Sequence, residues 1–355
     1  MQRGSSNGWD ADAWAGAPPV RIAPAGTAMK IKTVLVTGAS GKLGRSLVPA
    51  LLKAGYQVRA TQFRTPVKVP GVRTVTGSIS DPGFARRALA GADAVCHLAT
   101  CKEDSENFFD VSIRGTFTLL DEARRRGGLK QFILASGDAA LGIFFYPQPK
   151  PLDEGAPLAA YPGCYAFSKV MEEVMVGQYH IQYGLPSTIL RISWIHGEDD
   201  LLAHMTLRPP DFGGPAWRDL ARSARQKEMF RKKREAVGCL VHPDGRPFIR
   251  HIVGIADVVQ SFLLALGNPA AVGQTFNIAG PEAFSYDALA AHIAGRLGVP
   301  VVKFTCREGH DFRINIGKAR SVLGYDPRWD AARIADAGIA WRGAGGRRPP
   351  IRYRG

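Results

Sequence analysis

The fold is decided by residues 32–44, which read Lys32-Thr33-Val34-Leu35-Val36-Thr37-Gly38-Ala39-Ser40-Gly41-Lys42-Leu43-Gly44. The first part is mostly β-branched or apolar and predicts a buried strand, and a helical pattern follows. Glycines at this junction permit a tight turn, close approach of the backbone to a pyrophosphate, and close packing of helix on strand. The helix N-terminus then offers free N–H groups to the phosphates. The pattern predicts a dinucleotide-binding loop, against the alternative of an ordinary glycine-rich turn.

Downstream of this loop, short β-branched runs alternate with longer helical patterns, which is typical of a doubly wound parallel sheet. Glycines mark the ends of the helical patterns. The sequence therefore predicts an α/β fold of the Rossmann type. Strands are expected at 32–37, 57–61, 73–76, 94–98, 131–135 and 188–192. Helices are expected at 43–54, 82–89, 112–126 and 164–183, with two more within 285–297 and 332–341.

The chain has 355 residues, which exceeds the usual size of one domain, so a smaller domain is expected beside the large one. Beyond Trp194 the alternation of strands and helices becomes irregular before it resumes. The expected division is a disordered extension over 1–29, an NAD(P)-binding Rossmann domain over 30–193 with 249–281, a smaller discontinuous C-terminal substrate-binding region over 194–248 with 282–342, and a disordered basic tail over 343–355.

The composition is that of an ordinary globular protein, with 45% apolar and 22% charged residues. The five cysteines are odd in number and no two of them have the spacing of a zinc knuckle, so neither a disulfide framework nor a metal site is expected. No apolar run has the length of a signal peptide or of a membrane span. We expect a soluble cytoplasmic protein without a metal and without a membrane partner.

The net charge of +15 is concentrated in two segments, 206–235 and 341–355. The second is rich in Arg, Gly and Pro and is expected to be a disordered tail. The first is either a solvated helix face or a surface that attracts a phosphorylated or otherwise anionic substrate. No nucleic-acid-binding module accompanies the charge, so nucleic acid is not an expected partner.

The end of the second strand indicates which dinucleotide is bound. An acidic residue there binds the ribose hydroxyls of NAD, whereas an arginine nearby accommodates the 2′-phosphate of NADP. Gln62 stands at this position and Arg64 follows it, with no acid between residues 59 and 64. NADP is therefore favoured over NAD. Arg45 either reinforces the same phosphate contact or is, like Arg64 in the alternative interpretation, a plain surface charge.

A phenol and an amine stand four residues apart on one predicted helix, at Tyr165 and Lys169. This spacing places both side chains on one face of the helix. An ammonium group beside a phenol favours the phenolate, so Tyr165 can exchange a proton with a substrate alcohol or carbonyl. Following a glycine-rich loop, the pair predicts redox chemistry on a bound nicotinamide.

These motifs resemble the extended short-chain dehydrogenase/reductase family, also called the NAD-dependent epimerase/dehydratase family, over roughly residues 30–342. The stretches that carry the resemblance are Thr37 to Gly44, Gly91 to Ala99, Arg114-Gly115-Thr116, Tyr165 to Lys169, Arg191 to Gly197, Phe276 to Gly280 and Leu323 to Pro327. The resemblance implies that Tyr165 takes the proton as hydride leaves the substrate carbon, and that Lys169 binds the nicotinamide ribose. The cofactor-binding set it implies, with the loop, is Gly38, Ser40, Gly41, Lys42, Leu43, Gly44, Arg64, Leu98, Ala99 and Lys169. A homodimer is common in the family.

The sequence departs from the family where a third catalytic group is expected. The family places a Ser or Thr five residues before the glycine at Gly142, and that position is Gly137 here. Ser136, one residue early, is either brought to the site by a shifted loop or is structural. Alternatively, Asp138 or a water substitutes for the hydroxyl. Dehydratases of the family have an Asp-Glu pair after the Thr, and the pair here is Asp138-Ala139, which counts against dehydration.

Three residues are expected on the substrate side: Asp138, His196 and Arg250. Arg250 matches the arginine that binds the diphosphate in nucleotide-sugar enzymes of the family, whereas His196 is either a substrate contact or a packing residue. We therefore expect an NAD(P)-dependent oxidoreductase or epimerase that acts on a small carbohydrate-like substrate. The alternative, suggested by Gly137, is a catalytically weak NAD(P)-binding regulatory or scaffold protein.

Overall fold

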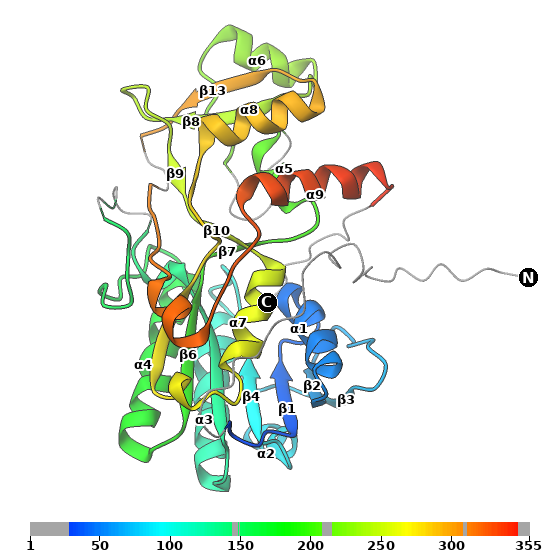
Figure 1. Ribbon diagram of the computed structural model, residues 1–355, viewed down its shortest axis with the longest axis vertical. Helices are drawn as coiled ribbons and strands as arrows, with labels where there is room; N and C mark the ends of the chain where they lie inside the picture. The colour runs from blue at the N-terminus through cyan, green and yellow to red at the C-terminus, as the bar shows by residue number, and fades with distance from the viewer. Residues whose placement is uncertain (1–27, 144–147, 149, 208–214, 308–310, 347–355) are drawn as a thin grey trace, which may run out of the picture.

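Seven parallel strands form the larger part of the protein, with the order β11-β6-β5-β4-β1-β2-β3 (Figure 1). The computed structural model describes residues 28–143, 148, 150–207, 215–307 and 311–346. The strands are β1 (Thr33–Thr37), β2 (Gln57–Gln62), β3 (Arg73–Thr76), β4 (Ala94–His97), β5 (Gln131–Gly137), β6 (Ser187–Ile192) and β11 (Gln274–Ile278). The chain winds outward from β1 in both directions, which is the doubly wound Rossmann topology that the sequence predicts.

Helices cover both faces of this sheet. On one face α1 (Lys42–Lys53) and α7 (Ile255–Ala265) bury leucines, valines and phenylalanine against alternate residues of the strands. On the other face lie α2 (Pro82–Leu89), α3 (Gly115–Arg126) and α4 (Cys164–Tyr183). Consecutive residues of a strand point to opposite faces, so Val34 and Val36 belong to the first core and Leu35 to the second. β1, β4, β5 and β6 are almost wholly buried, whereas β2 and β11 begin with exposed residues and the edge strand β3 is mostly exposed.

The helix ends follow from local chemistry. Asp81 accepts a hydrogen bond from the backbone of Phe84, and Pro82 occupies the first turn of α2, so both favour a helix start there. Gly184, in a left-handed conformation, ends α4. The predicted helix 112–126 is in fact α3 preceded by a π-helical turn over Phe109–Arg114. Short 3-10 turns follow at Asp138–Ala140 and Pro269–Ala271.

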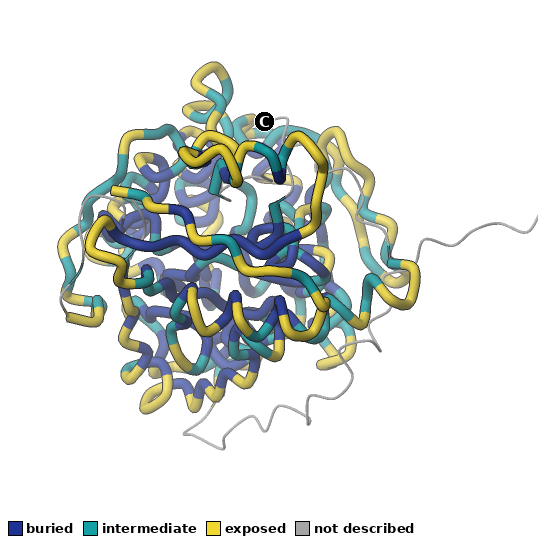
Figure 2. The backbone as a smooth tube through the Cα atoms, turned by 90° about the horizontal axis from the view of Figure 1, so that it is seen from above, coloured by how far each residue is buried: buried dark blue, intermediate teal, exposed yellow. Residues whose placement is uncertain are grey.

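A smaller region lies above the carboxyl ends of the strands and has its own core (Figure 1). Its strands form three pairs: β8 (Val237–Val241) with β13 (Val301–Thr305), β9 (Ile249–Arg250) with β12 (Phe284–Ser285), and β7 (Trp194–His196) with β10 (Ile252–Gly254). Its helices are α5 (Asp200–Met205), α6 (Ala224–Arg231), α8 (Tyr286–Leu297) and α9 (Ala331–Gly343). Seen from above, exposed segments run around the outside and also cross the face nearest the viewer, with buried segments between and beneath them (Figure 2).

Some segments that the expected division assigns to one region pack in the other. β9, expected in the Rossmann domain, pairs with β12 of the smaller region. Conversely Phe312 and Tyr325, with the π-helical turn Ala319–Leu323 between them, pack into the core beneath α1 and α7. The segments predicted to be a disordered extension and tail lie largely outside the described residues, as do residues 208–214 of the basic segment.

Candidate active site

The turn from β1 into α1 requires glycine at two positions, Gly38 in the loop and Gly44 in the first turn of α1. Gly38 has a φ of +65°, and a Cβ on it would lie 2.7 Å from the backbone nitrogen of Ala99. A Cβ on Gly44 would lie 2.5 Å from the Cα of Ala39. Gly41 is the N-cap residue before α1 and has no side chain to occupy the free N–H groups. The result is a cradle of backbone at a helix N-terminus, which fits the pyrophosphate of a dinucleotide.

The end of β4 is held against this cradle by hydrogen bonds. The hydroxyl of Thr37 accepts from the backbone N–H groups of Leu98 and Ala99, at 3.1 and 3.2 Å. It also lies 2.7 Å from Nδ1 of His97. Burial lowers the pKa of His97 to about 3, so its imidazole is neutral and fixes the strand end. Leu98 and Ala99 thereby border the loop, where the sequence predicts a cofactor contact.

Other residues of the predicted loop set have different surroundings. Leu43 is buried in the core, and Ser40 is half-buried. The amine of Lys42 lies 2.5 Å from a carboxylate oxygen of Asp200 and donates to the carbonyl of Ile195 at 3.2 Å. Lys42 therefore links the loop to the smaller region, a contact between residues far apart in sequence.

The end of β2 contains no acid. The side-chain amide of Gln62 donates to the hydroxyl of Thr76 at 2.9 Å and accepts from the backbone of Val67 at 3.0 Å. Arg64 is exposed, with its guanidinium 5.3 Å from the centre of the Phe63 ring. The end of β2 thus presents an amide and a guanidinium. An arrangement that binds the ribose hydroxyls of NAD would have a carboxylate there.

Tyr165 and Lys169 lie on α4, next to the end of β5. The amine of Lys169 donates to the carbonyl of Ala135 at 3.0 Å and to Glu172 at 2.7 Å, and the ion pair with Glu172 is almost fully buried. This amine is 5.7 Å from the centre of the Tyr165 ring. The hydroxyl of Tyr165 lies beside Gly137: a Cβ at Gly137 would be 3.3 Å from the Tyr165 hydroxyl oxygen. The position that lacks a hydroxyl in the sequence therefore adjoins the phenol in space.

Ser136 is engaged elsewhere. Its hydroxyl donates to Glu173 at 2.5 Å, and Glu173 pairs with the guanidinium of Arg191 at 2.9 Å. Successive residues of a strand point to opposite faces, so Ser136 and Gly137 cannot both face Tyr165 in this strand conformation. The structure does not bring Ser136 to the phenol.

Lys102 is a residue of this site that sequence reasoning missed. Its amine lies 3.6 Å from the centre of the Tyr165 ring. Burial, together with the positive charges of Lys169 and Lys42, lowers the pKa of Lys102 to about 7. A signal was available, because Lys102 follows β4 at the carboxyl edge of the sheet, where α/β proteins bind their ligands.

Asp138 lies at the same edge, beside Ser193. The Ser193 hydroxyl donates to the carboxylate at 2.9 Å. Burial raises the pKa of Asp138 to about 6, although the hydrogen bond from Ser193 and the positive charge of Arg250 oppose this shift. The carboxyl group can therefore change its protonation state near neutral pH.

Trp194 is the centre of the predicted substrate side. The guanidinium of Arg250 lies 3.9 Å from the centre of the Trp194 ring, and the ring of His196 is 4.5 Å away. Arg250 is 4% exposed and hydrogen-bonds Tyr286, while its Nε has no hydrogen-bond partner among the described residues. Asp138 is close enough for its charge to act on Arg250. The structure thus brings the three predicted substrate residues into one neighbourhood.

His204 completes this aromatic cluster and was not predicted. Its Nε2 lies 2.6 Å from the hydroxyl of Tyr286, and its backbone carbonyl accepts from the indole of Trp217 at 3.0 Å. Burial lowers the pKa of His204 well below its ordinary value. No motif indicates these residues, because helix α5 and the start of α8 meet only in the folded chain.

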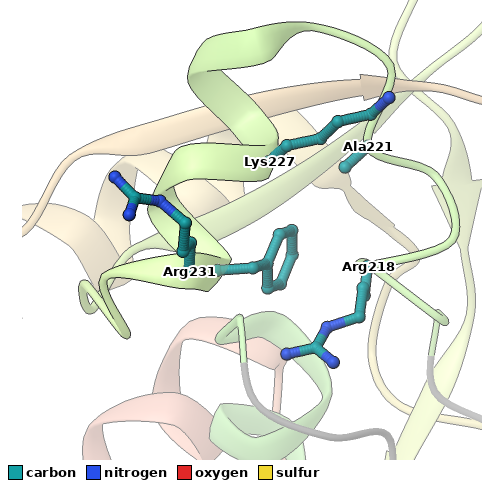
Figure 3. Close-up of a pocket in the computed structure, with 5 residues that line it drawn as sticks. Arg218, Ala221, Lys227 and Arg231 are labelled. Carbon is teal, nitrogen blue, oxygen red and sulfur yellow. The ribbon is translucent and has the colours of Figure 1, made fainter.

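The basic segment contributes to a separate pocket on α6, lined by Arg218, Ala221, Lys227, Phe230 and Arg231. Its volume of about 240 Å³ is below that of an ordinary ligand site. In Figure 3 the amine of Lys227 and the guanidinium of Arg231 point away from each other. Arg231 is also paired with Glu228 at 2.5 Å. The charges do not converge, which favours the solvated face over an anion site.

Within the described ranges, no group of three or more His, Cys, Asp or Glu side chains is placed to hold a metal ion. Among the helices of those ranges, none combines the length and the apolar character needed to cross a bilayer.

Known proteins resemble this chain both in sequence and in structure. The model of the NAD dependent epimerase/dehydratase family matches residues 34–279. A dTDP-glucose 4,6-dehydratase of Streptomyces griseus is 26% identical over 337 residues, which cover 87% of this chain and 93% of that protein. A uronate dehydrogenase of Pseudomonas putida is 28% identical over 170 residues, covering 47% of this chain and 62% of that one.

Among solved structures, a short-chain dehydrogenase/reductase superfamily protein of Agrobacterium tumefaciens with bound NAD is similar, with a TM-score of 0.76 and 26% identity. The match covers 88% of this chain and 98% of that chain. The UDP-glucuronic acid 4-epimerase of Bacillus cereus in complex with NAD has a TM-score of 0.67 at 21% identity, covering 87% and 96%, and shares the fold.

Proposed function

This chain belongs to the NAD-dependent epimerase/dehydratase family, and we propose that it is an NADP-favouring oxidoreductase or epimerase that acts on a carbohydrate-like alcohol or ketone through Tyr165. The observation that carries this proposal is the position of the Tyr165 hydroxyl. It stands over Gly137, at the carboxyl end of β5, on the same edge of the sheet as the glycine cradle. A substrate carbon held there lies between the phenol and the cofactor.

In the proposed reaction Tyr165 moves the proton. A bound nicotinamide supplies or accepts hydride at the substrate carbon. Tyr165 takes the proton of the substrate alcohol during oxidation and returns it to the carbonyl oxygen during reduction. Lys169, anchored by Glu172 and the carbonyl of Ala135, holds a positive charge beside the phenol and favours its ionised form.

The substrate-binding side is proposed to be the cluster around Trp194. Arg250 offers a buried guanidinium whose Nε has no partner among the described residues, so an acceptor on a ligand would complete its hydrogen bonding. Aromatic rings beside such donors suit a sugar ring and its hydroxyls. Relatives named for a dTDP-glucose and for uronates support a sugar-like substrate, with or without an attached nucleotide.

NADP is proposed as the preferred cofactor. Gln62 and Arg64 stand at the end of β2, and neither repels a 2′-phosphate as a carboxylate would. The related structures named above contain NAD, so the preference is a property proposed for this chain alone. Arg64 is proposed to pair with the phosphate.

The proposal is tested by turnover. The purified protein is assayed with NADP and NAD against UDP-glucose, UDP-glucuronic acid, dTDP-glucose, glucuronic acid and galacturonic acid, following reduced nicotinamide by absorbance and epimers by chromatography. We expect turnover of at least one compound, and a loss of about a thousandfold in Tyr165→Phe with cofactor affinity unchanged. Co-purified cofactor together with epimer formation would favour an epimerase, and accumulation of reduced nicotinamide a dehydrogenase.

Gly137 supports a second candidate function, a catalytically weak NAD(P)-binding regulator. The site adjoining the phenol has no side-chain hydroxyl at position 137, and Ser136 is bound to Glu173. Cofactor binding without turnover of any compound, by wild type or by Tyr165→Phe, would support this function and contradict the enzyme.

We also propose that the chain forms a homodimer through α3 and α4. Phe167, Val174 and Ile181 lie seven residues apart along α4 and are 46%, 45% and 74% exposed, with Phe117 of α3 49% exposed beside them. An exposed apolar stripe of this kind marks an interaction surface. Light scattering of wild type should give the mass of a dimer and that of Ile181→Lys the mass of a monomer. A monomeric wild type would contradict this proposal.

A cytoplasmic location is proposed as well. All five cysteines lie in the described ranges and are free thiols, which is the state favoured in a reducing compartment. Detection of a disulfide in protein isolated from its own cells would argue against it.

A further inference from the structure

Gly137 adjoins the Tyr165 hydroxyl and has no side chain that could offer a hydroxyl of its own. A Cβ there would point at the Tyr165 hydroxyl, 3.3 Å away. The backbone of Gly137 is extended, with φ −151° and ψ 161°, so a residue with a side chain can adopt it. The reacting oxygen of a substrate bound at Tyr165 therefore has no second hydrogen-bond donor from this position.

A cation lies over the same phenol from another element. The amine of Lys102, in the segment after β4, is 3.6 Å from the centre of the Tyr165 ring. The charged groups that act on this amine are Lys169 and Lys42, which repel its charge, and Asp138 and Glu103, which attract it. Lys102 is the ammonium nearest to the ring in the described structure, since that of Lys169 is 5.7 Å away.

We propose that Lys102 replaces the missing hydroxyl: its amine donates a hydrogen bond to the substrate oxygen that exchanges a proton with Tyr165. This inference rests on the proposed function and identifies a further catalytic residue for it. The donor comes from the end of β4 instead of the end of β5, and it carries a charge.

The chemistry balances without a net proton transfer from Lys102. During reduction of a ketone, hydride from the nicotinamide forms the new C–H bond, and the C=O π electrons become a lone pair on oxygen. Tyr165 then gives that oxygen its proton. Lys102 keeps its own protons and stabilises the negative charge that develops on the oxygen. Oxidation of the alcohol reverses each step.

The donors of Ser136 and Lys169 have partners of their own near the phenol. Ser136 donates to Glu173, and the amine of Lys169 is held by Glu172 and the carbonyl of Ala135. Asp138 accepts from Ser193, and above its pKa of about 6 the carboxylate has no proton to donate. Because its pKa is lowered to about 7, the amine of Lys102 is mostly charged only below neutral pH.

The test is a rescue experiment with the best substrate of the panel. Lys102→Met should lower kcat by about a hundredfold or more, as expected for loss of one oxyanion donor. Gly137→Ser introduces a hydroxyl beside Tyr165. The kcat of the double variant Lys102→Met with Gly137→Ser should therefore be at least about tenfold higher than that of Lys102→Met. Lys53→Met, which removes an exposed lysine at the end of α1, is the matched control and should leave kcat unchanged.

Two readouts separate this role from a structural or cofactor-binding one. The affinity for NADPH, measured by fluorescence titration without substrate, should be the same in Lys102→Met as in wild type. The pH profile of wild-type kcat should fall above about pH 7, as Lys102 loses its charge, and Lys102→Arg should move that fall to higher pH. Lys102→Arg also serves as the folded variant should Lys102→Met prove unstable.

Three results would overturn the inference. Unchanged kcat in Lys102→Met removes the role outright. A loss of NADPH affinity that accounts for the whole effect assigns Lys102 to the cofactor. Failure of Gly137→Ser to recover activity, when Gly137→Ser alone keeps the kcat and NADPH affinity of wild type, shows that Lys102→Met did not remove a donor. A wild type that turns over no compound contradicts the proposed function itself, and the inference with it.

Discussion

The proposed site has two halves that are built in different ways, one proposed for the nucleotide and one for the substrate. The nucleotide half uses backbone: Gly38 and Gly44 have no room for a Cβ, and Gly41 leaves a helix N-terminus open. The substrate half uses side chains, with Arg250 on Trp194 and Lys102 on Tyr165. A backbone site is confined to one short stretch of sequence, whereas a side-chain site gathers residues from several elements. The comparison implies that mutations should act differently in the two halves.

The sharpest test of the backbone half is Gly38→Ala. The added methyl would lie 2.7 Å from Ala99 N and 2.8 Å from Leu98 C, both backbone atoms that cannot turn aside. We expect NADP affinity to fall by about a hundredfold or more, measured by calorimetric titration. Gly55→Ala is the matched control, because Gly55 also has a positive φ, +89°, but nothing lies within 4 Å of its Cβ position.

The control should bind NADP normally and lose only about 1 kcal/mol of folding free energy, the cost of a left-handed alanine. Equal losses of affinity in both variants would mean that backbone strain, and not the shape of the cradle, explains the effect. The description of the nucleotide half as a backbone site would then be wrong.

A second test asks whether the nucleotide half also contains a side-chain contact. Arg64→Ser should weaken NADP binding by about tenfold and leave NAD binding unchanged, because one charge-assisted contact to the 2′-phosphate is lost. The control is Arg73→Ser. Arg73 is exposed at the amino end of β3, whereas Arg64 follows the carboxyl end of the neighbouring strand β2. The ratio of the two dissociation constants is the measurement. A ratio unaffected by Arg64→Ser would leave this half with backbone contacts only and remove the basis for the NADP preference.

The same contrast explains what the sequence could predict. The six strands predicted at β1 to β6 agree with the structure to within two residues at each end, and the predicted bounds of α2 and α4 are those observed, because period-2 and period-3.6 patterns are local. The glycine loop was recognisable for the same reason. The pairing of β8 with β13, over sixty residues apart, has no local signature.

The substrate half was only partly predictable. Asp138, His196 and Arg250 were identified one at a time, but nothing in the chain shows that Trp194 joins them or that His204 contacts Tyr286. Lys102 was missed because its significance depends on contact with a residue of another element. Such a site depends on contacts between segments that are distant in sequence, and these contacts leave no local pattern in the chain.

A third prediction concerns charge in the substrate half. The pKa of Asp138 is raised by burial to about 6, above the value of about 3.9 for an unfolded Asp, so the folded protein binds a proton that the unfolded chain has released between these values. The stabilising effect of that proton is present at low pH and is lost as the pH rises through 6. Asp138→Asn has no such dependence.

Measured by urea denaturation, wild type relative to Asp138→Asn should be more stable at about pH 5 than at about pH 8, by about 1 kcal/mol. Asp257, whose pKa is also raised to about 6 by burial, is present in both proteins and cancels. If the difference in free energy of unfolding between wild type and Asp138→Asn does not change with pH, Asp138 is as well solvated as an ordinary surface carboxylate.

The smallest effect is expected at Ser136. Its hydroxyl donates to Glu173 at 2.5 Å, and Arg191 still pairs with Glu173 when that donor is removed. Ser136→Ala should therefore cost about 0.5 to 1 kcal/mol of folding free energy and change kcat by less than about threefold. A catalytic hydroxyl would give a loss of about a hundredfold instead, with little change in stability. Measuring kcat and denaturation on one preparation separates the two outcomes. A large loss of kcat would move the third catalytic group back to β5, to a hydroxyl that the observed strand points away from Tyr165, and would show that β5 changes its conformation when substrate binds.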